Sequence, residues 1–334
     1  MDAIFTALYN GESLTQAQSQ TLFDHIIRGE MDPIQLASAL TALKIKGETP
    51  EEIAGAASAL VENAKDFPRP SYDFADIVGT GGDGANTINI STTAAFIAAA
   101  CGAKVAKHGN RGVSSKSGSS DLLDAFGIDL TMSPDTARQA LDDLGLCFLF
   151  APHYHGGVKH AMPVRQALAT RTIFNLLGPL INPARPNLEL MGVYDEALVE
   201  PIAKTMAAMG FEHALVVHGS GLDEVAVHGS THVAEVKNGH VRSFTLTPQD
   251  FGLETYRLKD LEGGSPEENR AHTQAILQGQ GQPAHQAAVA ANVALLLTLF
   301  GQPDLKANTQ KALKAMADGA GYAVMQALAQ RGHA

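Results

Sequence analysis

The sequence is poor in the features that would place a protein outside the cell or in a membrane. It contains no tryptophan and only two cysteines, Cys101 and Cys147, among 334 residues. Both cysteines lie in apolar segments, so we expect buried free thiols and not a disulfide framework. No apolar run approaches the ~18 residues that a membrane-spanning helix needs, and the first residues lack the basic and apolar segments of a signal peptide. We therefore expect a cytoplasmic protein.

Positive charge is also scarce. Lysine and arginine total 24 against 35 aspartates and glutamates, which gives a net charge of −11. This balance argues against broad binding to nucleic acids or membrane surfaces. An anionic small-molecule substrate would therefore need a local cationic patch. Residues 107–116 supply one, because they contain Lys107, Arg111 and Lys116.

The sequence pattern changes near residue 68. Residues 1 to about 67 carry apolar side chains at helical spacing, with helix starts predicted at Thr15 with Gln18, Asp32 before Pro33, and Thr49 before Pro50. Pro68 and Pro70 then break the pattern and mark a linker.

After the linker, short apolar strands alternate with helices. The expected strands are residues 77–78, 104–107, 146–150, 188–193 and 214–217. Asn238-Gly239 predicts a tight hairpin between strands 233–237 and 240–245. From residue 267 the pattern is again helical. We predict an α/β fold: a small N-terminal α-helical domain, and a large α/β domain with a mainly parallel central sheet and a C-terminal helical region.

Two motifs lie at the ends of expected strands. Gly-Thr-Gly-Gly-Asp at residues 79–83 follows strand 77–78, where glycine permits a sharp turn and a close approach to phosphate. Its spacing matches neither a Walker A loop nor a dinucleotide fingerprint, so a simple tight turn remains an alternative. Lys-His-Gly-Asn-Arg at 107–111 opens a long polar run, which is typical of a binding loop but also of a solvated loop.

Between the two motifs, residues 89–93 lead into an alanine-rich helix, 94–100, whose first N–H groups suit an anion. Together they predict a polyphosphate pocket.

Residues 79–83 and 107–111 resemble the signatures of the anthranilate phosphoribosyltransferase family of tryptophan biosynthesis. The resemblance continues through residues 171–180, Asn182-Pro183 and residues 221–224, and so covers nearly the whole chain. It implies transfer of the phosphoribosyl group from 5-phosphoribosyl 1-pyrophosphate to the amine of anthranilate, with no catalytic side chain. One departure is Ala169, where the family usually has glycine.

The resemblance also implies the domain organisation and the partners. A helical segment of about 160–187 would join residues 1–67 in the small domain, and residues 71–159 and 188–334 would form the large donor-binding domain. Magnesium, two ions per subunit, would assist the reaction. The family is usually a homodimer built through the small domain, and neither nucleic acid nor membrane is an expected partner.

The family motifs assign three groups of site residues. Magnesium would contact Ser91, Asp223 and Glu224, and anthranilate would contact Gly79, Asn110 and Arg165. From the residue pattern alone, the acid pair could equally be a solvated turn, Ser91 a helix N-cap and Arg165 a surface residue. The phosphoribosyl pyrophosphate would contact Gly79, Gly82, Asp83, Thr87, Asn89, Ile90, Ser91, Thr92, Lys107, His108, Gly109, Asn110, Arg111, Gly112, Val113, Ser114, Ser115 and Ser119.

Three alternatives stay open at this point. The block at 107–111 is shared with pyrimidine-nucleoside phosphorylases, which are typically longer and carry an extra C-terminal α/β domain. A nucleic-acid-binding relative of the transferase would need a basic face, against the net charge of −11. A zinc site at His153, His155 and His160 would have an unusual spacing, with no cysteine or acid close by.

Overall fold

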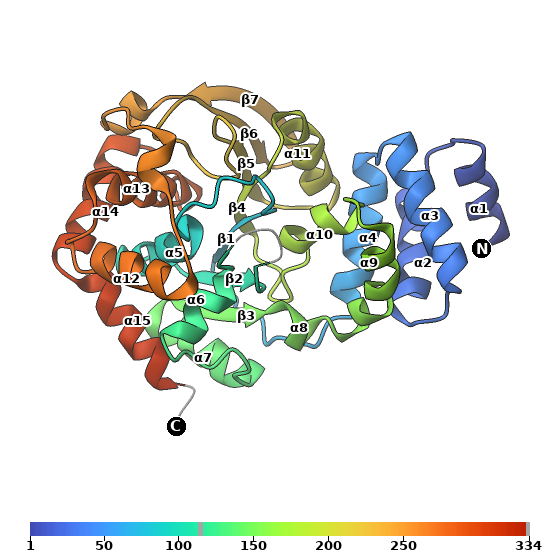
Figure 1. The fold of residues 1–334 in the computed structure, drawn as a ribbon, viewed down its shortest axis with the longest axis horizontal. Coiled ribbons are helices and arrows are strands. Elements are labelled where there is room, and N and C mark those ends of the chain that lie inside the picture. Colours follow the sequence, from blue (N-terminus) through green and yellow to red (C-terminus); the bar gives the residue numbers. More distant parts are fainter. Residues whose placement is uncertain (113–115, 332–334) are drawn as a thin grey trace.

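The N-terminal helices begin at the predicted capping residues. The computed structural model describes residues 1–112 and 116–331. Helices α1 (Asp2–Tyr9), α2 (Gln16–Ile27), α3 (Pro33–Lys46) and α4 (Pro50–Glu62) lie together at one end of the molecule (Figure 1). Reciprocal capping boxes form at Thr15 with Gln18 and at Thr49 with Glu52, and the Asp32 side chain caps α3. The predicted helix starts are therefore confirmed.

A seven-stranded sheet forms the centre of the larger part of the molecule (Figure 1). The spatial order is β3-β2-β1-β4-β5-β6-β7; the first five strands are parallel, and β6 and β7 are antiparallel additions. This confirms the predicted fold class. The strands are β1 (Ala75–Gly79), β2 (Val105–Gly109), β3 (Leu146–Phe150), β4 (Leu188–Gly192), β5 (His213–His218), β6 (Thr231–Lys237) and β7 (His240–Leu246).

The predicted hairpin is confirmed at the edge of this sheet. Asn238 and Gly239 join β6 to β7, and both have left-handed backbones, with φ of 49° and 78°. Two consecutive residues of this kind match the type I′ turn that Asn-Gly favours.

Helices cover the two faces of the sheet and give two apolar cores. On one face lie α5 (Ile90–Ala100), α12 (Pro266–Leu277), α13 (Pro283–Leu299), α14 (Leu305–Ala317) and α15 (Ala320–Arg331). On the other face, α11 (Val199–Ala208) packs on β5 and β6 and also contacts α4. The second core is therefore shared between the N-terminal helices and this sheet face. None of the helices in the described part of the chain has the length and apolar character needed to cross a membrane.

The middle of the chain connects these layers. Helices α6 (Ser119–Ala125) and α7 (Pro134–Leu144) precede β3, and α8 (Ala151–Tyr154), α9 (Met162–Leu168) and α10 (Phe174–Leu180) follow it. Short 3-10 turns occur at Gly156–His160, Glu196–Leu198, Pro248–Phe251 and Leu258–Leu261.

One predicted helix start is wrong. Helix α5 starts at Ile90 and not near residue 94, because the run 90–93 already has helical backbone.

Candidate active site

The site lies where the order of the parallel strands reverses. From β1 the chain first builds β2 and β3 on one side, and then returns to place β4 on the other side. In open α/β sheets, ligands bind beside the carboxyl ends of the strands at such a reversal. The turn at residues 79–83 leaves β1 here, and residues 107–111 end the neighbouring β2. The structure thus brings the two sequence motifs to one edge of the sheet.

Glycines at the ends of β1 and β4 make room for the Asp223 segment. A Cβ on Gly79 would lie 2.2 Å from Asp223 Oδ2, and one on Gly192 would lie 1.7 Å from the Asp223 carbonyl oxygen. The Gly81 N–H donates to Asp223 Oδ2 at 2.6 Å. Residue 223, which follows Gly221 in the sequence, is therefore held directly against the glycine turn.

Asp223 is buried, Glu224 beside it is half-buried, and both share the site with Ser91. The Ser91 N–H at the start of α5 donates to Glu224 Oε1 at 3.1 Å. Burial raises the pKa of Asp223 to about 7, with a further contribution from Asp83. Burial and Asp223 raise the pKa of Glu224 to about 8. Two adjacent acids with pKa values raised in this way favour protonation, or else a bound cation.

Ser91 is not the N-cap of helix α5, which was the alternative role that the residue pattern allowed. The N-cap of α5 is Asn89, whose side chain makes no capping bond, and Ser91 lies inside the first turn. Glu224 instead occupies one of the free N–H groups at this helix end. The expected open anion site at the start of α5 is thus partly filled by an acid of the protein itself.

The donor set suits magnesium better than a transition metal. Among the described residues, no group of three or more His, Cys, Asp or Glu side chains is arranged to hold a metal. Magnesium needs no such cage, because it keeps several waters and binds through one or two carboxylates together with substrate phosphates. Asp223, Glu224 and the Ser91 hydroxyl fit that requirement. The zinc alternative at His153, His155 and His160 gains no support.

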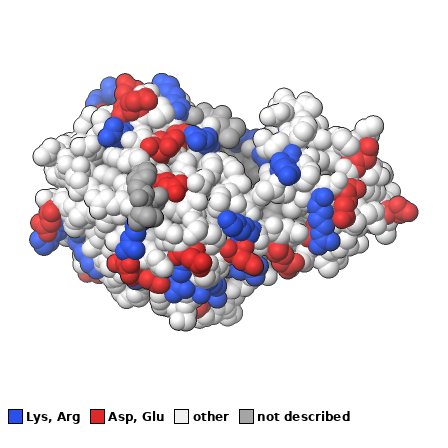
Figure 2. Space-filling model, turned by 90° about the horizontal axis from the view of Figure 1, so that it is seen from below, with Lys and Arg blue, Asp and Glu red and all other residues white. Residues whose placement is uncertain are grey.

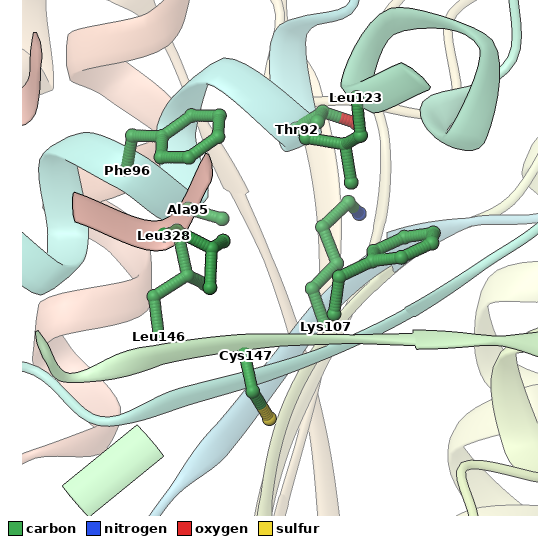
Figure 3. A pocket seen from close by; sticks show the side chains of 9 residues that line it. Thr92, Ala95, Phe96, Lys107, Leu123, Leu146, Cys147 and Leu328 are labelled. Carbon is green, nitrogen blue, oxygen red and sulfur yellow. The ribbon is translucent and has the colours of Figure 1, made fainter. Parts of the chain in front are cut away.

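Lys107, the first residue of the second motif, is buried. Its Nζ donates to the Ile77 carbonyl oxygen at 2.5 Å and lies 3.5 Å from Ser91 Oγ. Burial lowers its pKa, and the acids Asp76, Glu224 and Asp223 oppose that shift. A small cavity of about 10 Å³ adjoins it, and Figure 3 shows the Lys107 nitrogen directed toward Thr92 and away from Cys147. That volume holds about one water and neither substrate.

Asp121 organises the loop that follows β2. Its carboxylate accepts the Gly112 and Gly118 N–H groups, each at 2.9 Å, and pairs with Arg111 at 3.1 Å. Burial alone would raise the pKa of Asp121, but these hydrogen bonds and Arg111 lower it. Arg111, one of the three cations expected in the patch at 107–116, is therefore paired with an acid of the protein itself. Val113, Ser114 and Ser115 lie outside the described residues.

Other residues expected to contact the phosphoribosyl donor make hydrogen bonds within the protein or pack in its core. A Cβ on Gly109 would meet Ser119 Oγ at 2.2 Å, and Ser119 Oγ donates to the Asn110 carbonyl oxygen at 3.1 Å. Asn89 Nδ2 donates to the Ser117 carbonyl oxygen at 3.0 Å, which ties α5 to this loop. The side chain of Ile90 lies in the apolar core, and its N–H donates to the Ile88 carbonyl oxygen.

The turn after β1 has similar internal contacts. Gly82 has a left-handed backbone, with φ of 80°. Asp83 Oδ1 accepts the Ala85 N–H at 3.0 Å, as expected for a residue that holds loop amides. Thr87 is half-buried and bridges to Glu262. Asp83 therefore shapes the turn and also faces Asp223.

His108 and His155 form a buried pair between the sheet and α10. The rings meet edge to face at 5.3 Å, and His108 Nδ1 lies 3.1 Å from the Gly178 carbonyl oxygen. Burial, together with the neighbouring His155, lowers the pKa of His108 well below its usual value. Burial lowers the pKa of His155 to about 4. Both rings are therefore neutral near pH 7, and neither Nε2 has a partner among the described residues.

Arg165 lies on α9, on the side of the N-terminal helices. Its guanidinium stacks over the Phe174 ring at 4.9 Å from the centroid, and burial lowers its pKa. Among the described acids, none forms an ion pair with it. A half-buried arginine without an acidic partner is suited to a ligand carboxylate. Within the described ranges, no hydrogen bond links it to the two motifs.

Sequence reasoning missed several residues that support the site. Arg171 Nη2 donates to the Gly82 carbonyl oxygen at 2.5 Å, and its guanidinium stacks on Tyr194 at 3.7 Å. Asp76 and Asn182 form a buried hydrogen bond beneath β1 and β2. A charged residue inside the apolar strand β1 was the available signal for Asp76, because buried charges need partners.

Comparisons with known proteins agree along the whole chain. Residues 71–322 match the model described as "Glycosyl transferase family, a/b domain", and residues 3–64 match its helical bundle domain. An anthranilate phosphoribosyltransferase of Vibrio cholerae is 70% identical over 99% of this chain and 100% of its own length. One of Photobacterium profundum is 71% identical over 97% of this chain and 96% of its own.

Solved structures show the same similarity. The crystal structure of anthranilate phosphoribosyltransferase from Thermus thermophilus superposes with a TM-score of 0.94 at 39% identity, over 100% of both chains. The Saccharomyces cerevisiae enzyme, solved in complex with PRPP and Mg, superposes with a TM-score of 0.91 at 29% sequence identity, over 99% of this chain and 97% of its own. With this fold, these motifs and this degree of identity, the chain belongs to the anthranilate phosphoribosyltransferases of the glycosyl transferase family.

Proposed function

We propose that this chain is a magnesium-dependent anthranilate phosphoribosyltransferase. It transfers the phosphoribosyl group of 5-phosphoribosyl 1-pyrophosphate to the amine of anthranilate, and gives N-(5-phosphoribosyl)anthranilate and pyrophosphate. This is the second step from chorismate to L-tryptophan. The observation that carries the proposal is the 70% identity to a curated enzyme of this name over 99% of the chain. The structure agrees with this proposal, because Asp223 is hydrogen-bonded to the glycine turn and Lys107 is hydrogen-bonded to β1 just before that turn.

The proposed roles follow the placement of the residues. The donor is bound by the turn after β1 (Gly79, Gly82, Asp83), the segment that leads into and starts α5 (Thr87, Asn89, Ile90, Ser91, Thr92), the end of β2 (Lys107, His108, Gly109), and residues 110–115 with Ser119. Ile90 contributes backbone only, because its side chain is in the core. Gly79, Asn110 and Arg165 receive anthranilate. A planar guanidinium pairs with a carboxylate in two parallel hydrogen bonds, which suits Arg165 to that role.

The chemistry needs positioning and charge stabilisation and no covalent catalyst. Attack by the free amine expels pyrophosphate, so negative charge grows on the leaving group. Bound magnesium, two ions per subunit, would neutralise that charge, held by Asp223, Glu224 and Ser91. Lys107 and the loop N–H groups contribute fixed positive charge at the same place, and the two loops fix the donor near the acceptor.

We also propose that residues 1–67 and about 160–187 form one domain, and residues 71–159 and 188–334 the other. The ring contact between Phe23 and Phe174, with centroids 5.6 Å apart, and the hydrogen bond from Lys44 Nζ to the Arg171 carbonyl oxygen, at 2.8 Å, support the first grouping. The Arg171 contact with Gly82 then joins the two domains beside the site. The buried free thiols of Cys101 and Cys147 fit a reducing, cytoplasmic location.

A homodimer would form through the first helices. Tyr9, Ile34 and Ile45 are 62%, 81% and 80% exposed. A groove of about 670 Å³ between α1 and α3 is lined by Leu8, Ala42 and Ile45 among others. Exposed apolar side chains around a groove mark a protein interface more often than a free surface. Light scattering on the wild type and on Ile45→Asp tests this, since only the wild type should have the dimer mass.

The activity is tested by following anthranilate fluorescence with phosphoribosyl pyrophosphate and magnesium. Fluorescence should fall only when both are present. Thymidine with phosphate, the substrate pair of the phosphorylase alternative, should give no reaction. The nucleic-acid alternative needs a basic face, whereas Figure 2 shows acidic and basic side chains interleaved over the face it displays.

A further inference from the structure

Strands β1 and β2 pair along only a short part of their length. The register of β1 with β4 covers five positions, Ala75 to Gly79, and that of β2 with β3 also covers five, Val105 to Gly109. Between β1 and β2 only Ala75 and Val105 are partners. The hydrogen-bond ladder between these two strands is therefore open from their second residue to their carboxyl ends, although the strands remain neighbours in the sheet. Backbone groups along this opening need other partners, because buried N–H and C=O groups are costly when unpaired.

Side chains supply those partners. Asn182 Nδ2 donates to the Ala106 carbonyl oxygen at 2.8 Å. The Asp76 carboxylate accepts the N–H of His108, 3.3 Å from each oxygen, and the N–H of Ile77 at 2.7 Å. Lys107 Nζ donates to the Ile77 carbonyl oxygen. Hydrogen bonds that a regular parallel ladder would make directly thus run through inserted side chains.

Asp76 and Asn182 act as one unit in this opening. Asn182 Nδ2 also donates to Asp76 Oδ2 at 2.8 Å, and Asn182 Oδ1 accepts the Ala184 N–H at 2.9 Å. Both side chains are almost fully buried, at 0% and 3% exposure. Each donor and acceptor of the two side chains has a partner. The hydrogen bonds therefore fix the geometry of the opening, and the side chains do more than fill its space.

The opening faces the proposed donor site. The glycine turn begins at the end of β1 with Gly79, and β2 ends in the residues that follow Lys107. The separation of these two loops is set by how far β1 and β2 diverge below them. We propose that Asp76 and Asn182 are positioning residues for the phosphoribosyl donor: they hold the carboxyl ends of β1 and β2 apart, so that the two loops can clamp the donor between them. The proposal rests on the proposed function and adds two residues that touch no substrate.

Isosteric variants separate positioning from simple stability. Asp76→Asn places an amide against the Asn182 amide, and Asn182→Asp places two carboxylates together. Either change breaks the unit without removing volume. We expect each to lower kcat/KM for the donor by about tenfold to a hundredfold, the loss expected for a misplacement of roughly 1 Å. The thermal shift on adding phosphoribosyl pyrophosphate and magnesium should shrink in parallel. All kinetics are measured well below the melting temperature of each variant.

Glu189 offers a matched control. It is the in-register neighbour of Asp76 on β4, it is equally buried, and neither carboxyl oxygen has a partner among the described residues. Glu189→Gln should leave donor kinetics and the donor-induced shift at wild-type values. The exchange variant, Asp76→Asn with Asn182→Asp, restores the mutual hydrogen bond but loses two contacts with β2: the bond to the Ala106 carbonyl oxygen and one of the two contacts with the His108 N–H. It should recover part of the lost kcat/KM, or fold where a single variant does not.

The outcomes distinguish the inference from the function. Single variants that melt earlier but keep the wild-type donor kcat/KM and donor-induced shift would overturn the positioning role. If the single variants do not fold, a folded exchange variant with wild-type donor KM would overturn it as well, because the lost contacts with β2 should raise that KM. A wild-type protein that shows neither turnover nor a donor-induced shift would instead remove the proposed function itself.

Discussion

Gly79 and Asp223 are in direct contact, and this contact explains the glycine at the end of β1. Gly79 is not among the left-handed glycines, so its backbone does not require glycine. A methyl group there would, however, lie 2.2 Å from Asp223 Oδ2. The residue is therefore glycine because a carboxylate of the protein packs against it. A ligand requirement alone, which the sequence suggested, is not needed to explain it.

Gly79→Ala should therefore act through Asp223. We expect an overpacking cost of about 1–3 kcal/mol, reduced where the carboxylate moves away. A displaced carboxylate should weaken magnesium and donor binding by more than the loss of stability explains. Thermal unfolding with and without phosphoribosyl pyrophosphate and magnesium measures both effects. Gly156→Ala is the control, since a Cβ at Gly156 meets nothing within 4 Å. A Gly79→Ala protein with the full ligand-induced shift would refute this explanation.

The acid pair should make stability fall as pH rises. Folding raises the pKa of Asp223 to about 7 and that of Glu224 to about 8, mainly through burial. Between about pH 4, near the unfolded values, and pH 8, the folded protein thus binds more protons than the unfolded chain. The free energy of unfolding therefore decreases with increasing pH in this window. Magnesium favours the ionised pair, so its stabilising effect should grow from pH 6 to pH 8.

The control for this pH dependence is Asp223→Asn with Glu224→Gln. Buried histidines work in the opposite sense: His155 and His285, with pKa values lowered to about 4, cost stability when they protonate as pH falls. Subtracting the free energy of unfolding of the variant from that of the wild type at each pH removes the contribution of these histidines. That difference should slope downward with pH in metal-free buffer, and the variant should show no magnesium-induced shift. A flat difference would mean that the pair is ionised without a cation.

Arg165→Ala should impair the acceptor more than the donor. Hydrogen bonds to a charged group are worth about 1.5–3 kcal/mol, so the anthranilate KM should rise about tenfold to a hundredfold. The donor KM should stay within about twofold, since Arg165 makes no hydrogen bond to the described donor loops. Arg165→Lys should recover little, because a lysine cannot form the two parallel bonds. Equal changes in both constants would show that Arg165 only supports the local packing over Phe174.

Ala169→Gly should stabilise the protein without changing its kinetics. Ala169 ends α9 with a left-handed backbone, φ 46° and ψ 36°, a conformation that glycine adopts without strain. A non-glycine residue in this conformation costs roughly 1 kcal/mol, which glycine avoids. Because the side chain is exposed, nothing is lost by removing it. Denaturant unfolding measures the gain; an unchanged or lower free energy of unfolding would show that the strain is compensated elsewhere.

Local features of this fold could be predicted from the sequence. The capping boxes at Thr15 and Thr49 need only residues three apart, and the Asn238-Gly239 turn needs only two, so short-range chemistry determined them. The two binding motifs were also found, because each is a continuous run at a strand end. Their meeting at one edge follows from the parallel order of the strands.

The supporting contacts could not be predicted in this way. Asp76 and Asn182 are 106 residues apart, and Arg171 and Gly82 are 89 apart, so no local pattern connects them. The sequence placed Arg111 in a cationic patch, whereas the fold also places the acid Asp121 beside it. Which polar groups pair across the sheet depends on the opening between β1 and β2, and a single sequence does not show that opening.

The most direct measurement identifies the products of the wild type and of the Asp223→Asn, Glu224→Gln variant. Each protein is mixed with anthranilate, phosphoribosyl pyrophosphate and magnesium, and products are analysed by mass spectrometry together with a pyrophosphate assay. For the wild type we expect one N-(5-phosphoribosyl)anthranilate and one pyrophosphate for each anthranilate consumed, and for the folded variant almost none. Wild-type protein that leaves anthranilate unchanged, or a variant as active as the wild type, would contradict metal-assisted transfer at the acid pair.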